Sequence, residues 1–259
     1  MKKLIIALLT MSSLGFATSN PGEVLTISDD NTIILNMPIF SDSASEVSKK
    51  LLEKDKKLKP GKPIYIVLDT PGGSVEEGLK IIEVAKSLPR PVHTISLFSA
   101  SMGFVISQHL DSRFVIESST LMSHRAFVSG IKGEYPGSFI SRVFSMGNQL
   151  MAINSRVASR AGIPLKNYLD LIKNELWMGS DEAISYKFAD KKITLRCDSS
   201  LSGYAEPQDL DLGLFSLKIQ FHKCPLISQP KILKGESSIV NLLINRKMEF
   251  MNSFGTLLK

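Results

Sequence analysis

Two consecutive copies of one local pattern constrain the fold of this chain more than any other feature. In each copy an apolar run is followed by a turn of small residues and then by a helical stretch. The copies comprise a strand at 64–68, a turn at 69–75 and a helix at 78–88, then a strand at 92–98, a turn at 99–103 and a helix at 101–110. The unbroken apolar run 64–68 is typical of a strand buried on both faces of a parallel sheet. The pattern therefore predicts an α/β fold built from repeated βα units.

Both turns are expected at one edge of this sheet. In an open parallel sheet, ligands bind beyond the carboxyl ends of the strands, and both turns follow strands at that edge. Gly72 and Gly73 can expose backbone N–H groups to a substrate because they carry no side chains. Ser101, in the second turn, is a candidate nucleophile that requires a base and fixed donors for the developing oxyanion. Taken alone, either turn could equally be structural, and the glycine patterns of dinucleotide-binding folds and P-loops are both missing.

Among the four histidines, His124 is the best candidate for the base. It follows a short predicted strand that can return to the same edge of the sheet, where an imidazole can deprotonate Ser101. His109 lies eight residues further along the helix of the serine, roughly 12 Å away at the standard rise, which is out of reach. His93 begins a strand at the opposite edge, and His222 lies in the C-terminal tail. On the residues alone, a surface histidine with no catalytic role is the alternative for His124.

A histidine base needs an acceptor on its other ring nitrogen, which fixes the tautomer. The candidates are Asp170, Glu175 and Asp181. Asp170 falls within a predicted helix, and Asp181 falls in the first turn of another, where a carboxylate favours the helix dipole. Glu175 falls in the break between helices and can project freely, so it is the preferred third residue.

These pieces resemble the Clp-type serine protease family, the proteolytic subunit of the caseinolytic protease. The resemblance rests on four motifs in order, which are Pro71-Gly72-Gly73-Ser74-Val75 after an apolar strand, Ala100-Ser101-Met102-Gly103, Leu121-Met122-Ser123-His124 and Glu175-Leu176-Trp177-Met178. It covers roughly residues 24–192. It implies a ClpP/crotonase-like α/β fold of repeated βαβ units, in which 138–161 is the long handle helix by which rings pair.

Carried over residue by residue, the resemblance implies Ser101 as the nucleophile, His124 as the base, and the backbone N–H groups of Gly73 and Met102 as the oxyanion hole. The third acid falls on Glu175, where the family usually has an aspartate. The implied activity is hydrolysis of peptides or unfolded proteins through an acyl-enzyme, by a ring-like homo-oligomer. No cofactor or metal is expected. Two alternatives stay open: a non-catalytic oligomeric scaffold, and a protease of the signal-peptide-peptidase type, which uses a lysine as its base.

The first 17 residues predict export, with a periplasmic location as the expectation. They combine a basic start, a short apolar run and small residues around a cleavage point, and the run is too short for a membrane span. Their removal deletes Lys2 and Lys3 and no acids, so the formal charge falls from +6 to +4. The remaining charges are dispersed, so nucleic acid is not expected as a partner. An exported chain meets no ATP pool, so an ATP-driven unfoldase is not expected either.

The chain thus divides into a signal peptide at 1–17, a Clp-like protease domain at 24–192 and a C-terminal extension at 193–259 whose role is open. Cys197 and Cys224 are the only cysteines, and an even pair in an exported chain is a candidate disulfide. Two free thiols, or a metal pair formed with His222, are the alternatives. The extension is predicted to be loop-like at 206–213 and helical at 239–258.

Overall fold

The computed structural model describes residues 23–128, 131–211, 216–227 and 231–234. The expected signal peptide and the helix predicted at 239–258 lie outside these ranges. Within them, no helix is both long enough and apolar enough to cross a membrane.

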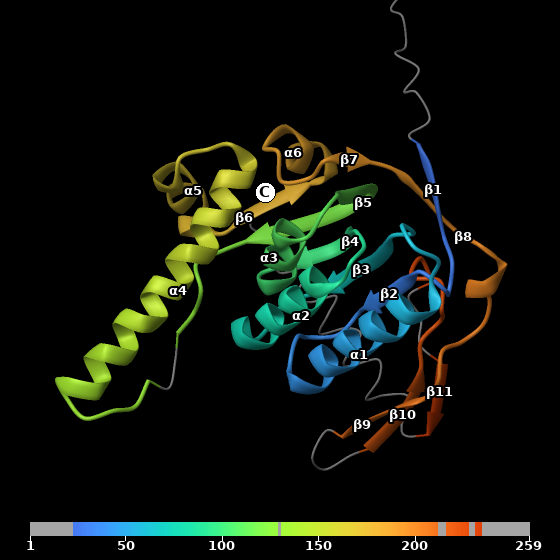
Figure 1. Cartoon of the computed structure of the whole chain (residues 1–259), viewed down its shortest axis with the longest axis horizontal. Helices are drawn as coiled ribbons and strands as arrows, with labels where there is room; N and C mark the ends of the chain where they lie inside the picture. Colours follow the sequence, from blue (N-terminus) through green and yellow to red (C-terminus); the bar gives the residue numbers. More distant parts are fainter. Residues whose placement is uncertain (1–22, 129–130, 212–215, 228–230, 235–259) are drawn as a thin grey trace, which may run out of the picture.

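A six-stranded sheet forms the centre of the molecule, in the order β2-β3-β4-β5-β6 with β7 beside β5 (Figure 1). Strands β2 to β5 run parallel, β6 pairs antiparallel with β5, and β7 pairs parallel with it. The strand bounds are β2 Thr32–Leu35, β3 Ile64–Thr70, β4 Val92–Ala100, β5 Arg113–Ser123, β6 Leu176–Gly179 and β7 Lys191–Lys192. The predicted α/β class with a parallel sheet is confirmed.

Helices cover one face of the sheet, and their bounds are α1 Ser41–Lys57, α2 Val75–Ser87, α3 Met102–His109, α4 Gly137–Ala161, α5 Leu165–Leu171 and α6 Ser180–Ser185. Alternate residues of β3, such as Ile66 and Leu68, pack against α1 and α2 in one buried cluster. Their neighbours Tyr65 and Val67 belong to a different cluster on the opposite face. Strand β3 is therefore buried on both faces, as its unbroken apolar run predicts.

Arg113 joins the start of β5 to the end of α3 and to the segment after α6. Its side chain is only 6% exposed, and its guanidinium donates to Asp190 Oδ1 at 2.5 Å and to Gln108 Oε1 at 2.6 Å. Burial alone would raise the pKa of Asp190, but the hydrogen bonds and the charge of Arg113, with the charge of Arg160, outweigh it and lower that pKa.

We expect Asp190→Asn to lower the free energy of unfolding by about 2 kcal/mol at pH 7, because it leaves a buried guanidinium without its counter-charge. The expected loss of unfolding free energy is smaller than that for a fully buried ion pair, because the Asp190 side chain is 40% exposed. A lowered carboxyl pKa stabilises the fold above the unfolded value of roughly 3.9, and this contribution is lost as the pH falls through the folded value. Urea titrations at pH 7 and pH 3 should therefore show a smaller wild-type advantage in acid.

The first part of the C-terminal extension packs on the face of the sheet opposite α1 and α2. Strand β8 Thr194–Cys197 pairs parallel with β1 Val24–Ile27, and the side chains of Leu201 and Cys224 are buried in the same cluster as Tyr65. A small antiparallel sheet follows, made of β9 Gln208–Asp211, β10 Ser216–Gln220 and β11 Lys231–Lys234. The prediction that 206–213 is loop-like is wrong at 208–211, because β9 pairs with β10, and 212–213 lie outside the described residues.

Cys197 and Cys224 form a disulfide with a Cα–Cα distance of 5.8 Å. The bond closes the chain between β8 and the segment after β10, next to the ion pair of Lys223 with Asp29, 3.0 Å between Nζ and Oδ2. We expect the double variant Cys197→Ser/Cys224→Ser to lose about 3 kcal/mol of unfolding free energy, as for a closed loop of this length. Denaturant titration of the oxidised wild type and the variant measures the difference. An unchanged midpoint would show that the cross-link does not constrain the unfolded chain.

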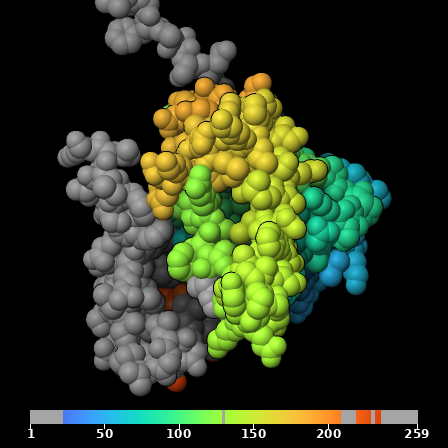
Figure 2. Space-filling view, turned by 90° about the vertical axis from the view of Figure 1, so that its left-hand side faces the viewer, coloured from blue at the N-terminus to red at the C-terminus, as the bar shows by residue number. Residues whose placement is uncertain are grey.

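Helix α4 projects from the body of the molecule (Figure 1) and stands forward in the space-filling view (Figure 2). Its buried residues, Ile153, Val157, Ala158 and Ala161, all lie in its second half. Apolar side chains remain exposed along the helix, among them Ile140, Val143, Phe144 and Met151. The projecting helix thus carries an apolar surface that the described part of the chain leaves exposed.

Candidate active site

Ser101 occupies the turn between β4 and α3 in a strained backbone conformation. Its φ of 54° and ψ of −117° fall in a region that residues with a side chain rarely adopt. The turn is held because the Ser101 N–H donates to Met122 O at 2.9 Å, while the Ser101 carbonyl accepts from Val105 N–H at 3.1 Å. A sharp strand-to-helix turn of this kind places the serine hydroxyl at the edge of the sheet, where a substrate can reach it.

His124 meets Ser101 directly, with 2.7 Å between Nε2 and Oγ. Strand order explains the contact: Ala100 and Met122 are register partners, so the residues that follow them emerge side by side. The end of β5 is fixed by Ser123, whose Oγ lies 2.7 Å from the hydroxyl of Tyr168 on α5. Burial raises the pKa of Tyr168 to about 12, so this phenol stays neutral and keeps its hydrogen bond.

Two backbone N–H groups, those of Gly73 and Met102, are the predicted donors of the oxyanion hole. In the turn after β3, Ile39 N–H donates to Gly72 O, and Ser74 N–H donates to Ile39 O, each at 2.8 Å. This parallel bridge uses the groups on either side of Gly73, so the Gly73 N–H points away from Ile39. Met102 is the first residue of α3, and its N–H has no acceptor within the helix.

The two turns lie in contact. A Cβ added to Gly72 would lie 2.7 Å from the Cβ of Ser101 and 2.8 Å from Met102 N. The turn that carries Gly73 therefore lies against the turn that carries Ser101 and Met102. The N–H groups of Gly73 and Met102 stay the predicted donors of an oxyanion hole.

The side chain of Glu175 makes a different hydrogen bond from the predicted one. Ser123 and Leu176 are the last register partners of β5 and β6, and the next pair would place Glu175 across from His124. Instead Glu175 has a φ of 63°, and its Oε2 accepts from the indole Nε1 of Trp177 at 3.0 Å. Within the described residues, no hydrogen bond joins its carboxylate to His124. The structure brings Ser101 and His124 together, and it brings Glu175 to Trp177.

The other titratable groups considered from the sequence lie elsewhere. Asp170 is exposed on α5, and Asp181 Oδ1 pairs with Lys192 Nζ at 2.7 Å. His93 Nδ1 accepts from Ser112 N–H, and the ring of His222 is 5.4 Å from that of Tyr204. Within the part of the chain that is described, no group of three or more His, Cys, Asp or Glu residues could hold a metal ion.

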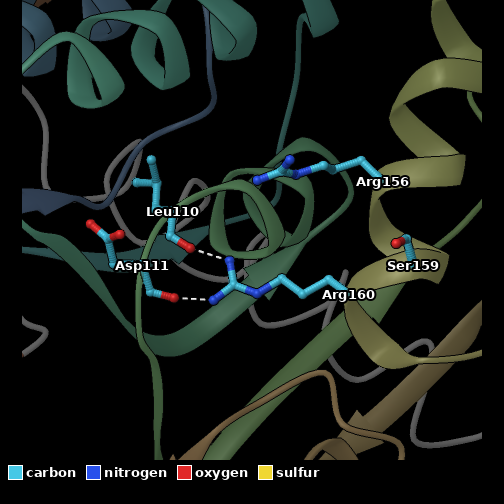
Figure 3. Close-up of a pocket in the computed structure, with 5 residues that line it drawn as sticks. All are labelled: Leu110, Asp111, Arg156, Ser159 and Arg160. Atoms are coloured by element: carbon cyan, nitrogen blue, oxygen red, sulfur yellow. Dashed lines mark hydrogen bonds between the residues drawn. The ribbon is translucent and has the colours of Figure 1, made fainter.

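A hollow of about 520 Å³ lies beside Leu110, the residue that follows α3 (Figure 3). Leu110, Asp111, Arg156, Ser159 and Arg160 line it. The guanidinium of Arg160 donates to the backbone carbonyls of Leu110 and Asp111 and, at 3.1 Å, to that of Gln108. It thereby satisfies carbonyls that the end of a helix leaves free. Because α3 is eight residues long, this hollow is roughly 12 Å from the nucleophile turn.

A serine hydroxyl bonded to an imidazole, at a strand-to-helix turn on an α/β sheet, is typical of serine hydrolases. Comparison with known proteins narrows the class. A family model described as Clp protease matches residues 23–196. The chain belongs to the Clp protease family and is a serine-type endopeptidase.

Curated relatives agree with this assignment. The ATP-dependent Clp protease proteolytic subunit 1 of Protochlamydia amoebophila is 31% identical over 173 residues, which covers 64% of this chain and 82% of the relative. Proteolytic subunit 2 of Treponema pallidum is 27% identical over 169 residues, covering 64% and 83%. The proteolytic subunit of Streptococcus suis is 26% identical over 165 residues, covering 62% and 84%.

Two features of the site were missed at the level of sequence. Tyr168 fixes the end of β5, but a tyrosine within a helical pattern gives no sign of its partner across the fold. Trp177 holds Glu175, and the signal was present: the only tryptophan of the chain lies two residues after the proposed acid.

Proposed function

We propose that this protein is an exported, ATP-independent serine endopeptidase in which Ser101 is the nucleophile and His124 the general base. The observation that carries the proposal is the 2.7 Å contact between Ser101 Oγ and His124 Nε2 at a strained turn. The expected substrates are peptides and unfolded polypeptides, which enter an edge-of-sheet site as extended chains.

The reaction follows from these positions. Ser101 Oγ attacks the substrate carbonyl carbon, and its proton passes to His124 Nε2. The carbonyl oxygen becomes an oxyanion that accepts from the N–H groups of Gly73 and Met102. The C–N bond then breaks, and His124 gives its proton to the leaving amine. Water, deprotonated by His124, attacks the acyl carbon and releases Ser101 with its proton restored.

The role of Glu175 as the third catalytic residue stays a prediction. For Glu175 to orient His124, one of its carboxylate oxygens must come within hydrogen-bond distance of the imidazole, whereas Oε2 accepts from the indole of Trp177. Catalytic hydrogen bonds can form only in the substrate complex, so a move of this kind is chemically reasonable. The alternative is a catalytic pair of Ser101 and His124 without a third acid. A comparison of kcat between wild type and Glu175→Gln separates these two possibilities.

Three observations support action outside the cytoplasm without an ATP-driven partner. The N-terminal 17 residues have the form of a signal peptide. A disulfide between Cys197 and Cys224 suits an oxidising compartment. The sequence contains no P-loop. The curated relatives are named as ATP-dependent, so independence from ATP would set this chain apart from them.

The apolar surface of α4 supports a homo-oligomer. The expected assembly is a ring of copies that pairs with a second ring through this helix. Its exposed Phe144 and Met151 are 67% and 44% accessible in a single chain. Burial of such side chains between copies would remove an apolar area that monomeric proteins rarely leave in water.

Two measurements test the proposal. Peptide hydrolysis by the mature protein in the absence of nucleotide should proceed, and added ATP should leave the rate unchanged. The N-terminus of the protein recovered from the periplasmic fraction should begin after residue 17. An uncleaved protein found only in the cytoplasm would contradict export, and a folded protein that hydrolyses no peptide would favour a non-catalytic scaffold.

A further inference from the structure

A short lysine-rich segment, residues 56–62, connects the end of α1 to β3. Four of its seven residues are lysines and none is acidic, the four being Lys56, Lys57, Lys59 and Lys62. All four are exposed, and within the described part of the chain their ammonium groups form no ion pair or hydrogen bond. The lysine segment therefore presents four uncompensated cations to solvent.

Arg90, in the turn between α2 and β4, fixes the shape of this segment from the inside. Its side chain is 6% exposed, and its guanidinium donates to Asp55 Oδ1 at 2.5 Å. The same group donates to four backbone carbonyls at 2.8 to 3.2 Å, those of Asp55, Leu58, Lys59 and Lys62. Arg90 thus neutralises the nearest acid and holds the backbone of the segment, so the cations need little ordering when an anionic partner binds.

The tip of the lysine segment is open. A Cβ added to Gly61 would meet no atom within 4 Å. Leu52 of α1 is 47% exposed and lies one helical turn before Lys56, which places an apolar side chain on the same face as the lysines. Exposed cations around an apolar side chain are typical of surfaces that lie in a membrane interface.

Further cations lie at the same edge of the sheet. Lys86 of α2, Arg90 and Arg156 of α4 line a hollow of about 490 Å³, with Asp111 as the acid among its described lining residues. Figure 3 shows the guanidinium of Arg156 extending from α4 toward Asp111. Within the described residues, neither Lys86 nor Arg156 has an ion-pair partner. The positive surface therefore continues from the lysine segment past Arg90 to α4.

The catalytic pair lies at the opposite edge of the sheet. The lysine segment precedes β3 and Arg90 precedes β4, whereas Ser101 follows β4. This strand has nine residues, and an extended chain of that length spans roughly 30 Å. A flat anionic surface against the lysine segment would leave Ser101 open to substrate on the far side of the molecule.

We propose that the lysine segment is a membrane-docking surface that binds anionic phospholipid headgroups. Clustered lysines are attracted to such headgroups, and each cation near the surface adds to the binding. Nucleic acid fits less well, because residues 54–62 contain no aromatic side chain on which bases could stack. The choice of a membrane as the partner rests on the proposed export, which brings the chain to a membrane surface outside the cytoplasm.

Sedimentation of the full mature protein with lipid vesicles tests this surface. The protein should sediment with vesicles of phosphatidylcholine and phosphatidylglycerol at low salt, and it should stay in solution with phosphatidylcholine alone. Salt at about 0.5 M should release it, because added ions screen the attraction between exposed charges. Absence of binding to the mixed vesicles, or equal binding to both kinds of vesicle, would overturn the proposal.

A quadruple variant and a matched control separate the lysine segment from net charge. Replacement of its four lysines by glutamine should lower the partition coefficient at least fiftyfold, since each cation near the surface accounts for about fivefold. The control removes the same charge from exposed lysines outside this edge, through Lys132→Gln, Lys166→Gln, Lys173→Gln and Lys234→Gln. It should bind within about threefold of wild type. Equal losses in the two variants would overturn the assignment to residues 56–62.

Duplex DNA is the competing ligand, and peptide hydrolysis keeps this inference separate from the proposed function. DNA that binds more tightly than the mixed vesicles at equal phosphate concentration would overturn the choice of a membrane. A protein that hydrolyses peptides but binds no vesicles keeps its function and overturns the docking surface. A protein that binds vesicles through the lysine segment but hydrolyses no peptide supports the surface and contradicts the proposed function. Circular dichroism and the thermal midpoint should match wild type in both quadruple variants, because the substituted side chains are exposed.

Discussion

We expect Ser101→Ala to lower kcat at least a thousandfold and to leave the fold intact. The hydroxyl forms the covalent bond to the substrate, so its loss leaves only binding and the backbone donors of Gly73 and Met102 to assist direct attack by water. The double variant Ser101→Ala/His124→Ala should lose little more, because the two residues act as one unit. Hydrolysis of a peptide coumarylamide measures the loss of kcat in the single and the double variant. The thermal midpoint of each variant shows that it is folded.

The matched variant Ser101→Gly tests the backbone strain at the same position. Alanine keeps the unfavourable φ of 54°, whereas glycine adopts it at no steric cost. We expect Ser101→Gly to be about 1 kcal/mol more stable than Ser101→Ala and equally inactive. A glycine variant less stable than the alanine variant would show that the turn stores no strain.

Gly73→Ala should give the second-largest effect, on activity and stability together. A Cβ at Gly73 would lie 2.4 Å from the backbone oxygen of Ile39 and 2.9 Å from its nitrogen, at a φ of +147°. Backbone cannot yield as a flexible side chain can, so the turn must shift and carry the Gly73 N–H away from the oxyanion. We expect a loss of about 10²-fold to 10³-fold in kcat and about 3 kcal/mol of unfolding free energy.

Gly61→Ala is the control for this substitution. Gly61 also has a positive φ, +76°, but an added Cβ would meet no atom within 4 Å. The control should lose about 1 kcal/mol of unfolding free energy from backbone strain and keep full activity. Similar kcat losses in both variants would contradict the assignment of Gly73 to the oxyanion hole.

Local pattern was sufficient to predict the centre of the fold. The apolar run of β3 specified a strand buried on both faces, and the glycine and serine turns specified the edge where the strands end. Glu117 and Ser118 interrupt the apolar pattern of β5, so the local pattern alone favours two short strands, at 113–116 and 120–123. Strand β5 is continuous because Ser119 Oγ accepts from Ile116 N–H and donates to Ser96 O of the neighbouring strand.

The parts that the sequence did not predict depend on long-range pairing. The order of the motifs predicted that Ser101 and His124 lie at one edge of the sheet, because both residues follow parallel strands. The environment of Glu175 depends on how the antiparallel strand β6 registers against β5 and on where that pairing ends. Likewise, β9 forms only because β10 lies beside it, and its polar residues give no local signal. Local propensity cannot specify contacts whose partners are chosen by the whole fold.

Covalent labelling tests the central claim most directly. The mature wild-type protein, incubated with a fluorophosphonate in the absence of nucleotide, should gain one adduct mass, which peptide mapping should place on Ser101. His124→Ala should label at least a hundredfold more slowly, because the hydroxyl loses the base that takes its proton. A folded wild-type protein that gains no adduct, or an adduct on Ser101 that forms equally fast without His124, would contradict the account.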